Sequence, residues 1–148
     1  MVHAPRRSSR KYRGEHHVRL YGWLLRSQAW RSLSAQSRAV LICLMDRYNG
    51  SNNGRIALSV RSAAAECRIT KDTAARAFHE LQDRGFIKLV TPGAFSRKVR
   101  HAAEWLLTEF RDDVSGDMPT KEFMCWRQNQ NSVPIQAVPV PSIGTVVR

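Results

Sequence analysis

Cysteine is scarce in this sequence, and its spacing limits what it can do. The three cysteines, Cys43, Cys67 and Cys125, are widely separated, odd in number and never in CxxC spacing. We therefore predict no structural zinc site, although the adjacent His16 and His17 keep that alternative open. Because Cys43 and Cys67 lie inside helical patterns, we expect both to be reduced residues of the core.

Long apolar segments are missing as well, and acidic residues are few. No stretch has the length and apolarity of a membrane span, and no strong basic amphipathic helix is present. The N-terminus is basic without an apolar run, which argues against a secretory signal. Only 12 Asp and Glu face 24 Lys and Arg, a formal net charge of +12 that attracts polyanions. We expect a cytoplasmic protein associated with the bacterial nucleoid and not with a membrane.

The sequence also lacks the motifs of catalysis. It contains no Gly-rich phosphate loop, no metal-ligand spacing and no evident nucleophile–base–acid set. His79 and His101 have no candidate partner nearby in the sequence. We therefore predict that the chain is not an enzyme and that it uses neither a cofactor nor a metal.

Length and composition predict one domain between two tails. The chain has 148 residues, of which 43% are apolar, enough for a packed core. Residues 1–17 are basic and aperiodic, residues 18–127 carry the periodic patterns, and residues 128–148 are polar and then rich in Val and Pro. We interpret these segments as a disordered arm, a domain that includes a short C-terminal helix, and a disordered tail.

The domain is organised around residues 59–89, which read SVRSAAAECRITKDTAARAFHELQDRGFIKL. Ser59 and Thr70 are capping residues, and each precedes a helical pattern. Gly85 ends the second pattern, because a left-handed residue is least costly as glycine. Apolar residues at i, i+3, i+4 and i+7 predict the buried face of that second helix: Ala74, Ala77, Phe78 and Leu81. Two helices across so short a turn indicate a helix-turn-helix.

The other face of the second helix carries the candidate contacts. These residues lie off the apolar stripe, and most are near the N-terminus of the helix: Lys71, Asp72, Thr73, Ala75, Arg76 and His79. Recognition helices present such positions to base edges in the major groove of DNA. The alternative is an ordinary solvated face. Ser59, Arg61 and Thr70, at the starts of the two helices, complete the predicted contacts in this region.

The remaining periodicities predict an α+β fold. We expect helices and an antiparallel hairpin at these positions: helices at 20–28, 35–48, 60–67 and 71–84, and strands at 86–91 and 103–110. Residues 55–58 are expected to join the hairpin as a third strand. Thr120 is expected to cap the short C-terminal helix, which contains Phe123, Met124 and Trp126.

Two basic segments accompany this fold. The connection inside the hairpin and the N-terminal arm carry these cations and one histidine: Arg97, Lys98, Arg100 and His101, and Arg6, Arg7, Arg10, Lys11 and Arg13. We predict that the connection lies near phosphates or in the minor groove. The arm is either a contact to the DNA backbone or minor groove, or a solubilising tail.

Residues 18–110 resemble the DNA-binding core of bacterial winged-helix proteins of the GntR and MarR type. The similarity lies in the Ser-started helix, the small-residue turn, the KDTAARA segment and the exit through Leu81 and GFI. With LYGWLLRSQAWRSLS and RYNGSNNG, the chain is also similar to small helix-turn-helix proteins of plasmids, phages and integrated elements. The resemblance implies that Lys71, Asp72, Ala75 and Arg76 approach base edges, while Thr73 and the wing hold phosphates. The chain departs from these families because it has neither a large effector domain nor long terminal helices.

The sequence therefore predicts a winged helix-turn-helix protein that binds double-stranded DNA. Three roles remain open: a transcription regulator, with repressor as the first choice; a replication or maintenance factor of a mobile element; and a protein-interaction module that antagonises another DNA-bound complex. The absence of ATPase and nuclease motifs favours the first role over the second. A homodimer stays open, and no small-molecule effector is assigned.

Overall fold

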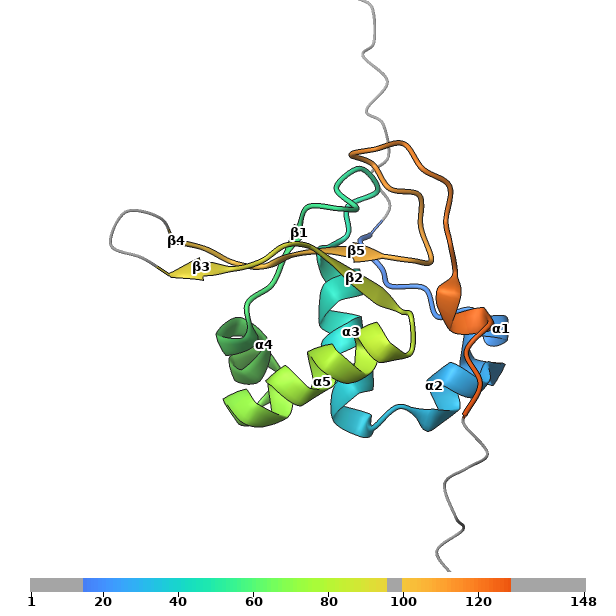
Figure 1. The fold of residues 1–148 in the computed structure, drawn as a ribbon, viewed down its shortest axis with the longest axis horizontal. Helices are drawn as coiled ribbons and strands as arrows, with labels where there is room; N and C mark the ends of the chain where they lie inside the picture. The colour runs from blue at the N-terminus through green and yellow to red at the C-terminus, as the bar shows by residue number, and fades with distance from the viewer. Residues whose placement is uncertain (1–14, 96–99, 129–148) are drawn as a thin grey trace, which may run out of the picture.

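The computed structural model describes residues 15–95 and 100–128. Within these ranges the chain is an α+β domain, in which helices pack beside a small antiparallel sheet (Figure 1). The predicted disordered segments lie largely outside these ranges. So do seven predicted DNA contacts: Arg6, Arg7, Arg10, Lys11, Arg13, Arg97 and Lys98.

Three helices form the centre of the domain: α3 Ala35–Arg47, α4 Val60–Cys67 and α5 Lys71–Asp83. Each begins where a hydroxyl side chain accepts a hydrogen bond from a backbone N–H of the first turn. The capping residues are Ser34, Ser59 and Thr70, each bonded to the N–H three residues ahead. The predicted helices over 35–48, 60–67 and 71–84 are confirmed to within a residue at each end.

The buried stripe of α5 holds the core together. Ala74, Ala77, Phe78 and Leu81 are all buried, as the spacing predicts. Phe78 stacks on Trp105 of the sheet, with ring centroids 4.7 Å apart and planes 12° apart. The helix α5 thereby joins the helical layer to the sheet.

The sheet consists of three antiparallel strands in the order β1, β5, β2. The strands are β1 Ile56–Ala57, β2 Ile87–Thr91 and β5 Glu104–Leu107. The expected pairing of the two hairpin strands is confirmed, and the segment after the SNNG loop is the third strand. The return strand ends at Leu107 instead of Phe110, and beyond it the Thr108 hydroxyl donates to the Gly85 carbonyl (2.7 Å).

The hairpin continues beyond this sheet as a second ladder. Strand β3 Ala94–Phe95 pairs with β4 Arg100–His101, and the ribbon extends away from the helices (Figure 1). Part of the segment expected as a loop over 94–101 is therefore strand. The register shifts between Leu89 and Thr91, and this irregularity separates the two ladders.

The first helix, predicted over residues 20–28, is shorter than expected. Two short helices replace it: α1 Gly22–Arg26 and α2 Gln28–Ser32. Ser27 lies between them with an extended backbone; its hydroxyl donates to the Leu24 carbonyl (2.7 Å) and accepts from the Trp30 N–H (3.1 Å). One side chain therefore ends the first helix and caps the second.

The C-terminal segment is also shorter than expected. It forms the 3₁₀ turn η1 Glu122–Met124, and Thr120 does not cap it because Lys121, in a left-handed conformation, is the preceding residue. Phe123 is buried and stacks on Phe86, with centroids 4.6 Å apart. The segment therefore packs on its own domain. Trp126 lies beyond the turn, under the Arg84 guanidinium.

The inner two cysteines lie where the sequence predicts. Cys43 and Cys67 are free, half-buried and packed against the core, while Cys125 is free and exposed. In the part of the chain that the structure describes, no helix combines the length and the apolarity needed to cross a membrane.

Candidate nucleic-acid interface

Helices α4 and α5 are joined by a three-residue turn, residues 68–70. Arg68 has left-handed dihedral angles (φ 54°, ψ 46°), and its N–H donates to the carbonyls of Ala64 and Ala65. The Ile69 N–H donates to the Ala64 carbonyl at 3.0 Å, and the Ile69 side chain packs against the core. These bonds end α4 abruptly, so that α5 starts in a new direction with its first turn at the surface.

The outer face of α5 presents the residues that the sequence singles out. Lys71, Asp72, Arg76 and His79 are exposed, whereas Thr73 and Ala75 are half-buried. The Arg76 Nε–H donates to the Asp72 carbonyl over a long 3.4 Å, so the guanidinium lies along the helix. Four of the six predicted positions on α5 are therefore open to a partner.

The predicted hydroxyl residues cap the N-termini of α4 and α5. Ser59 Oγ accepts from the Ser62 N–H (3.0 Å), and Thr70 Oγ1 accepts from the Thr73 N–H (3.2 Å). The Thr70 and Thr73 hydroxyls are also hydrogen-bonded to each other, at 2.8 Å. The structural role of these hydroxyls is to fix the first turns of α4 and α5. Any contact that they make with a ligand is in addition to these capping bonds.

A groove of about 610 Å³ lies between the start of α4 and the hairpin. Its walls are formed by Ser59, Val60, Arg61, Gly93, Ala94, Arg100, His101, Ala102 and Ala103. His101 is held in place by a hydrogen bond between its Nε2 and the Pro92 carbonyl (2.9 Å). The fold thus brings Ser59 and Arg61 together with Arg100 and His101, which lie far away in the sequence.

A second groove, of about 370 Å³, lies on the other side of α5, against the start of α3. It is lined by Ser34, Gln36, Thr73, Arg76, Ala77 and Glu80. The Glu80 carboxylate accepts from the Ser34 N–H (3.3 and 3.4 Å), the Ser34 hydroxyl (2.8 Å) and the Ser37 hydroxyl. Burial favours a higher pKa for Glu80, but the hydrogen bonds from Ser37 and Ser34 outweigh it and lower the pKa below its ordinary value.

Some positive charges of the domain have acidic or aromatic partners. Arg47 pairs with Glu66, Lys88 with Glu122, and Arg84 with Glu80, while Lys121 lies over the Trp23 ring. Among the ion pairs of the described residues, none involves Arg61, Arg68, Lys71 or Arg76. The surface of α4, the turn and α5 therefore carries cations without an acidic partner in residues 15–95 and 100–128.

Arg68 is the residue of this surface that the sequence prediction missed. It is exposed and lies in the turn between the two helices. The sequence did contain a signal for it, namely an arginine in the predicted turn. That turn lies where α4 ends and α5 begins.

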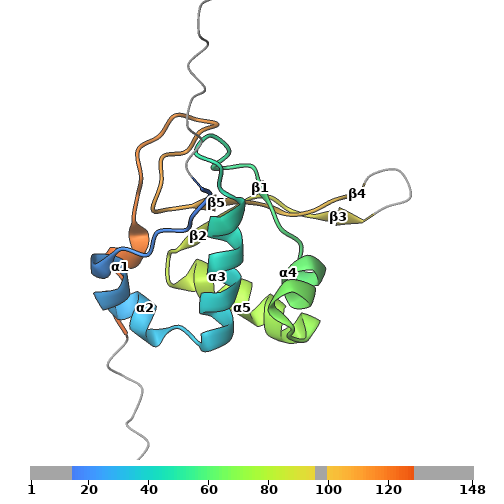
Figure 2. The same cartoon turned by 180° about the vertical axis from the view of Figure 1, so that it is seen from behind.

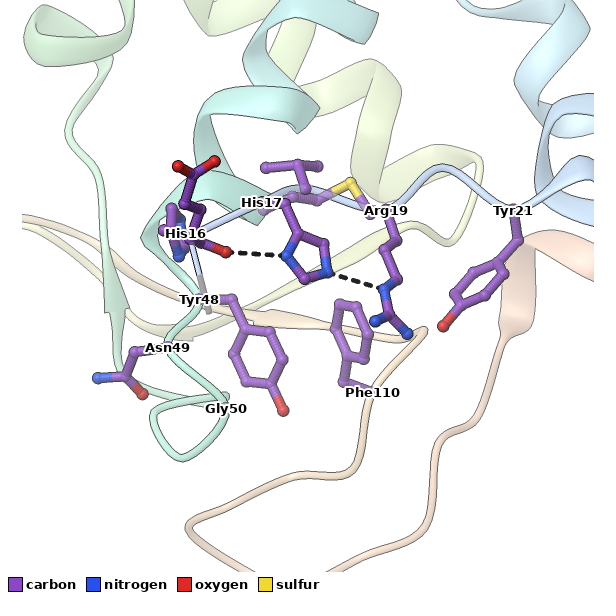
Figure 3. Close-up of a pocket in the computed structure, with 11 residues that line it drawn as sticks. His16, His17, Arg19, Tyr21, Tyr48, Asn49, Gly50 and Phe110 are labelled. Atoms are coloured by element: carbon purple, nitrogen blue, oxygen red, sulfur yellow. Dashed lines mark hydrogen bonds between the residues drawn. The ribbon is translucent and has the colours of Figure 1, made fainter. Parts of the chain in front are cut away.

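A third hollow, of about 390 Å³, lies at the end of α3 (Figure 3). The stacked rings of Tyr48 and Phe110, with centroids 4.5 Å apart, form one side of it. His17 accepts from the Arg19 Nε–H at its Nε2 (2.8 Å), while its Nδ1 lies 3.0 Å from the Glu15 carbonyl. Burial, with a contribution from Asp113, raises the pKa of Tyr48. No predicted contact residue lines this hollow, so it does not belong to the candidate interface.

No protein-family model, curated protein or solved structure matches this chain. Among the described residues, no three His, Cys, Asp or Glu side chains form a group that could hold a metal ion.

Proposed function

We propose that this protein is a winged helix-turn-helix regulator of transcription that binds double-stranded DNA in a sequence-specific manner and acts as a repressor. The arrangement of elements supports this: three helices with β1 between the first two, then a hairpin after α5, in the sheet order β1, β5, β2. The observation that carries the proposal is the set of cations without acidic partners around α5, namely Arg61, Arg68, Lys71 and Arg76.

In this proposal α5 enters the major groove. An α-helix with its side chains is about 10–12 Å across, and the major groove of B-DNA is about 12 Å wide. The exposed residues Lys71 and Arg76 lie on the first half of the helix, where base edges are within reach. The Arg76 guanidinium has the geometry for a bidentate bond to guanine O6 and N7.

The groove between the start of α4 and the hairpin suits the phosphate backbone. Arg61 and Arg100 lie on opposite walls of the groove between α4 and the hairpin, so a strand in that groove would meet cations from both sides. Arg68 in the turn extends the same positive surface. Contacts of this kind position the protein and supply affinity, whereas base contacts supply specificity.

The test is selection of bound duplexes from a random pool by the full chain, followed by affinity measurements on the selected site. We expect one sequence motif, and Arg76→Ala should weaken binding to it by about 1–3 kcal/mol and relax preference at one base position. Replacing Arg97, Lys98 and Arg100 together should weaken selected and random duplexes by similar factors. Arg26→Ala is the matched control, because α1 lies on the side opposite to α4 and the hairpin (Figures 1 and 2).

The same measurements separate the alternatives. Equal loss on all sequences for Arg76→Ala would make Arg76 a backbone contact. Sites at promoters support a regulator, whereas an array at an origin supports a replication or maintenance factor of a mobile element. A palindromic motif would support a two-fold homodimer. If the wild-type chain binds no duplex, the proposal is wrong and the interaction-module hypothesis replaces it.

A further inference from the structure

Two cysteines from different helices meet beside the helix-turn-helix. Cys43 lies in α3, and Cys67 is the last residue of α4. They are 24 positions apart in the sequence, yet their Sγ atoms are 3.5 Å apart. Both thiols are free, and each keeps some access to solvent because it is only half-buried. Cys125, by contrast, is exposed in the segment after η1.

We propose that Cys43 and Cys67 form a reversible disulfide when the folded chain meets a low-molecular-weight disulfide such as oxidised glutathione. A disulfide bond is about 2.05 Å long, so the two sulfurs have to approach each other by about 1.5 Å. Rotations of the two side chains contribute to that approach. The proposal does not depend on DNA binding.

Arg47 holds the two helices together next to this pair. Its Nη1–H donates to the Cys43 carbonyl at 3.0 Å, and its Nη2 forms an ion pair with Glu66, the neighbour of Cys67. The backbones that carry the two sulfurs are therefore connected through one guanidinium. This connection keeps the thiols near each other while the bond forms.

The chemistry is two successive thiol–disulfide exchanges. In the first, the Cys67 thiolate attacks one sulfur of glutathione disulfide, the S–S bond breaks, and one glutathione leaves as a thiolate that takes up a proton. In the second, Cys43 loses its proton and attacks the Cys67 sulfur of the mixed disulfide, releasing the second glutathione. The two cysteine thiols together lose two electrons, and glutathione disulfide is reduced to two glutathiones.

The order of attack follows from the environment of Cys43. Burial and the hydrogen bond with Cys67 raise the pKa of the Cys43 thiol to about 12, so little of it is thiolate near neutral pH. The first attack therefore falls to Cys67. The second step is expected to be the slower one and to accelerate as the pH is raised from about 7 to about 9, because the thiolate is the nucleophile.

The bond would fasten α3 to α4 immediately before the turn at Arg68. It closes a loop that contains β1 and all of α4, and it restricts the unfolded chain more than the folded one. For a loop of about 25 residues in a domain of this size, we expect the melting temperature to rise on the order of 10 °C.

Mass spectrometry of the full chain tests the proposal. The folded Cys125→Ser variant is incubated with oxidised glutathione, free thiols are alkylated, and trypsin is added. Cleavage after Lys and Arg places the three natural cysteines on separate peptides, 39–47, 62–68 and 122–127. We expect peptides 39–47 and 62–68 to be joined, a link that dithiothreitol reverses, and the oxidised chain to melt at a higher temperature than the reduced one.

The variants make the outcome decisive. In the Cys125→Ser protein, the further change Cys43→Ser should leave a glutathione on Cys67, with no peptide link and no rise in melting temperature. The further change Cys67→Ser should abolish both the peptide link and the glutathione adduct. In the wild type, Cys125 reports that the oxidant is active because it becomes glutathionylated. The proposal is overturned if Cys125 reacts while peptides 39–47 and 62–68 stay separate, or if they join only in urea.

Discussion

At the scale of single residues, Glu109 is a carboxyl group that is buried in the fold. It is 8% exposed, and its Oε1 atom is buried without a hydrogen-bond partner among the described residues. Burial raises its pKa from the ordinary 4.5 to about 7, against a lowering effect of Lys121. The ionised form is therefore disfavoured in the folded chain relative to the unfolded chain.

This pKa predicts a loss of stability with rising pH. Between pH 4.5 and about 7 the folded state holds the Glu109 proton that the unfolded state has released, so the free energy of unfolding falls as the pH rises. Relative to Glu109→Gln, the wild type should lose up to about 3 kcal/mol across this window. Urea denaturation of both proteins at several pH values measures the difference. If the free energies of unfolding of the two proteins change in parallel with pH, Glu109 is ionised in the fold and the prediction is wrong.

Phe78 is a buried aromatic residue that joins α5 to the sheet. It is 3% exposed and stacked on Trp105, so Phe78→Ala leaves a cavity between α5 and the sheet. We expect the free energy of unfolding to fall by about 3–5 kcal/mol. Met118→Ala is the control, since Met118 is 77% exposed and should change little. An unchanged melting curve for Phe78→Ala would place this ring outside the core.

At the scale of elements, one carboxylate adds a polar contact to the packing of α5 against α3. Glu80 accepts hydrogen bonds from the N–H and hydroxyl of Ser34 and from the hydroxyl of Ser37, and it lies 3.6 Å from the Arg84 guanidinium. A side chain of α5 therefore supplements the N-terminal cap of α3. This contact adds to the buried stripe of α5, which determines the residues that the helix presents outward.

Glu80→Ala should lower the free energy of unfolding by about 1.5–3 kcal/mol at neutral pH, the usual effect of losing hydrogen bonds to a charged group. Because the pKa of Glu80 is lowered in the fold, its contribution is present above its ordinary pKa. It is lost as the pH falls through the lower folded value. The difference from the wild type should therefore shrink in acid, as denaturation below pH 4 would measure. Glu66→Ala, which breaks a more exposed pair with Arg47, should cost less than about 1 kcal/mol.

At the scale of the whole molecule, one group of cations lies on α4, the turn and α5. Some cations elsewhere in the domain are engaged with carboxylates or rings, as for Lys121 over Trp23 and Arg84 between Glu80 and Trp126. Cations on α4, the turn and α5 are not paired with any described acid. In our proposal this surface faces the polyanion.

The N-terminal arm adds to that attraction in our proposal. Deleting residues 1–13 removes Arg6, Arg7, Arg10, Lys11 and Arg13 and should weaken binding to all duplexes without changing the fold. Each lost phosphate contact should reduce the slope of log K against log salt by about 0.9. Deleting residues 129–148 is the matched control, because this segment has only Arg148 as a cation. Identical salt titrations for the wild type and the arm deletion would make the arm a solubilising tail.

The sequence by itself determined the features that depend on neighbours within one helical turn. Ser34, Ser59 and Thr70 bond to N–H groups three residues ahead, so their caps and the helix starts were readable from short segments. The same holds for the positive φ of Gly85 and for the stripe of α5, which follow from local geometry and from the helical period. The break at Ser27 was equally local, and its serine was the signal that the prediction overlooked.

Only the tertiary structure decided the contacts that join distant segments. Asn53 lies in the SNNG loop, where sequence suggests an exposed turn, yet it is wholly buried. Its Oδ1 accepts from the Leu107 N–H (2.7 Å), and its Nδ2–H donates to the carbonyls of Leu107 (2.9 Å) and Arg111 (2.8 Å). The packing of Phe123 on Phe86 and the meeting of Cys43 with Cys67 are of the same kind. Such partners lie more than 20 positions apart, and a local sequence pattern does not select one distant partner over another. The partners are selected only when burial of the common core fixes the path of each segment.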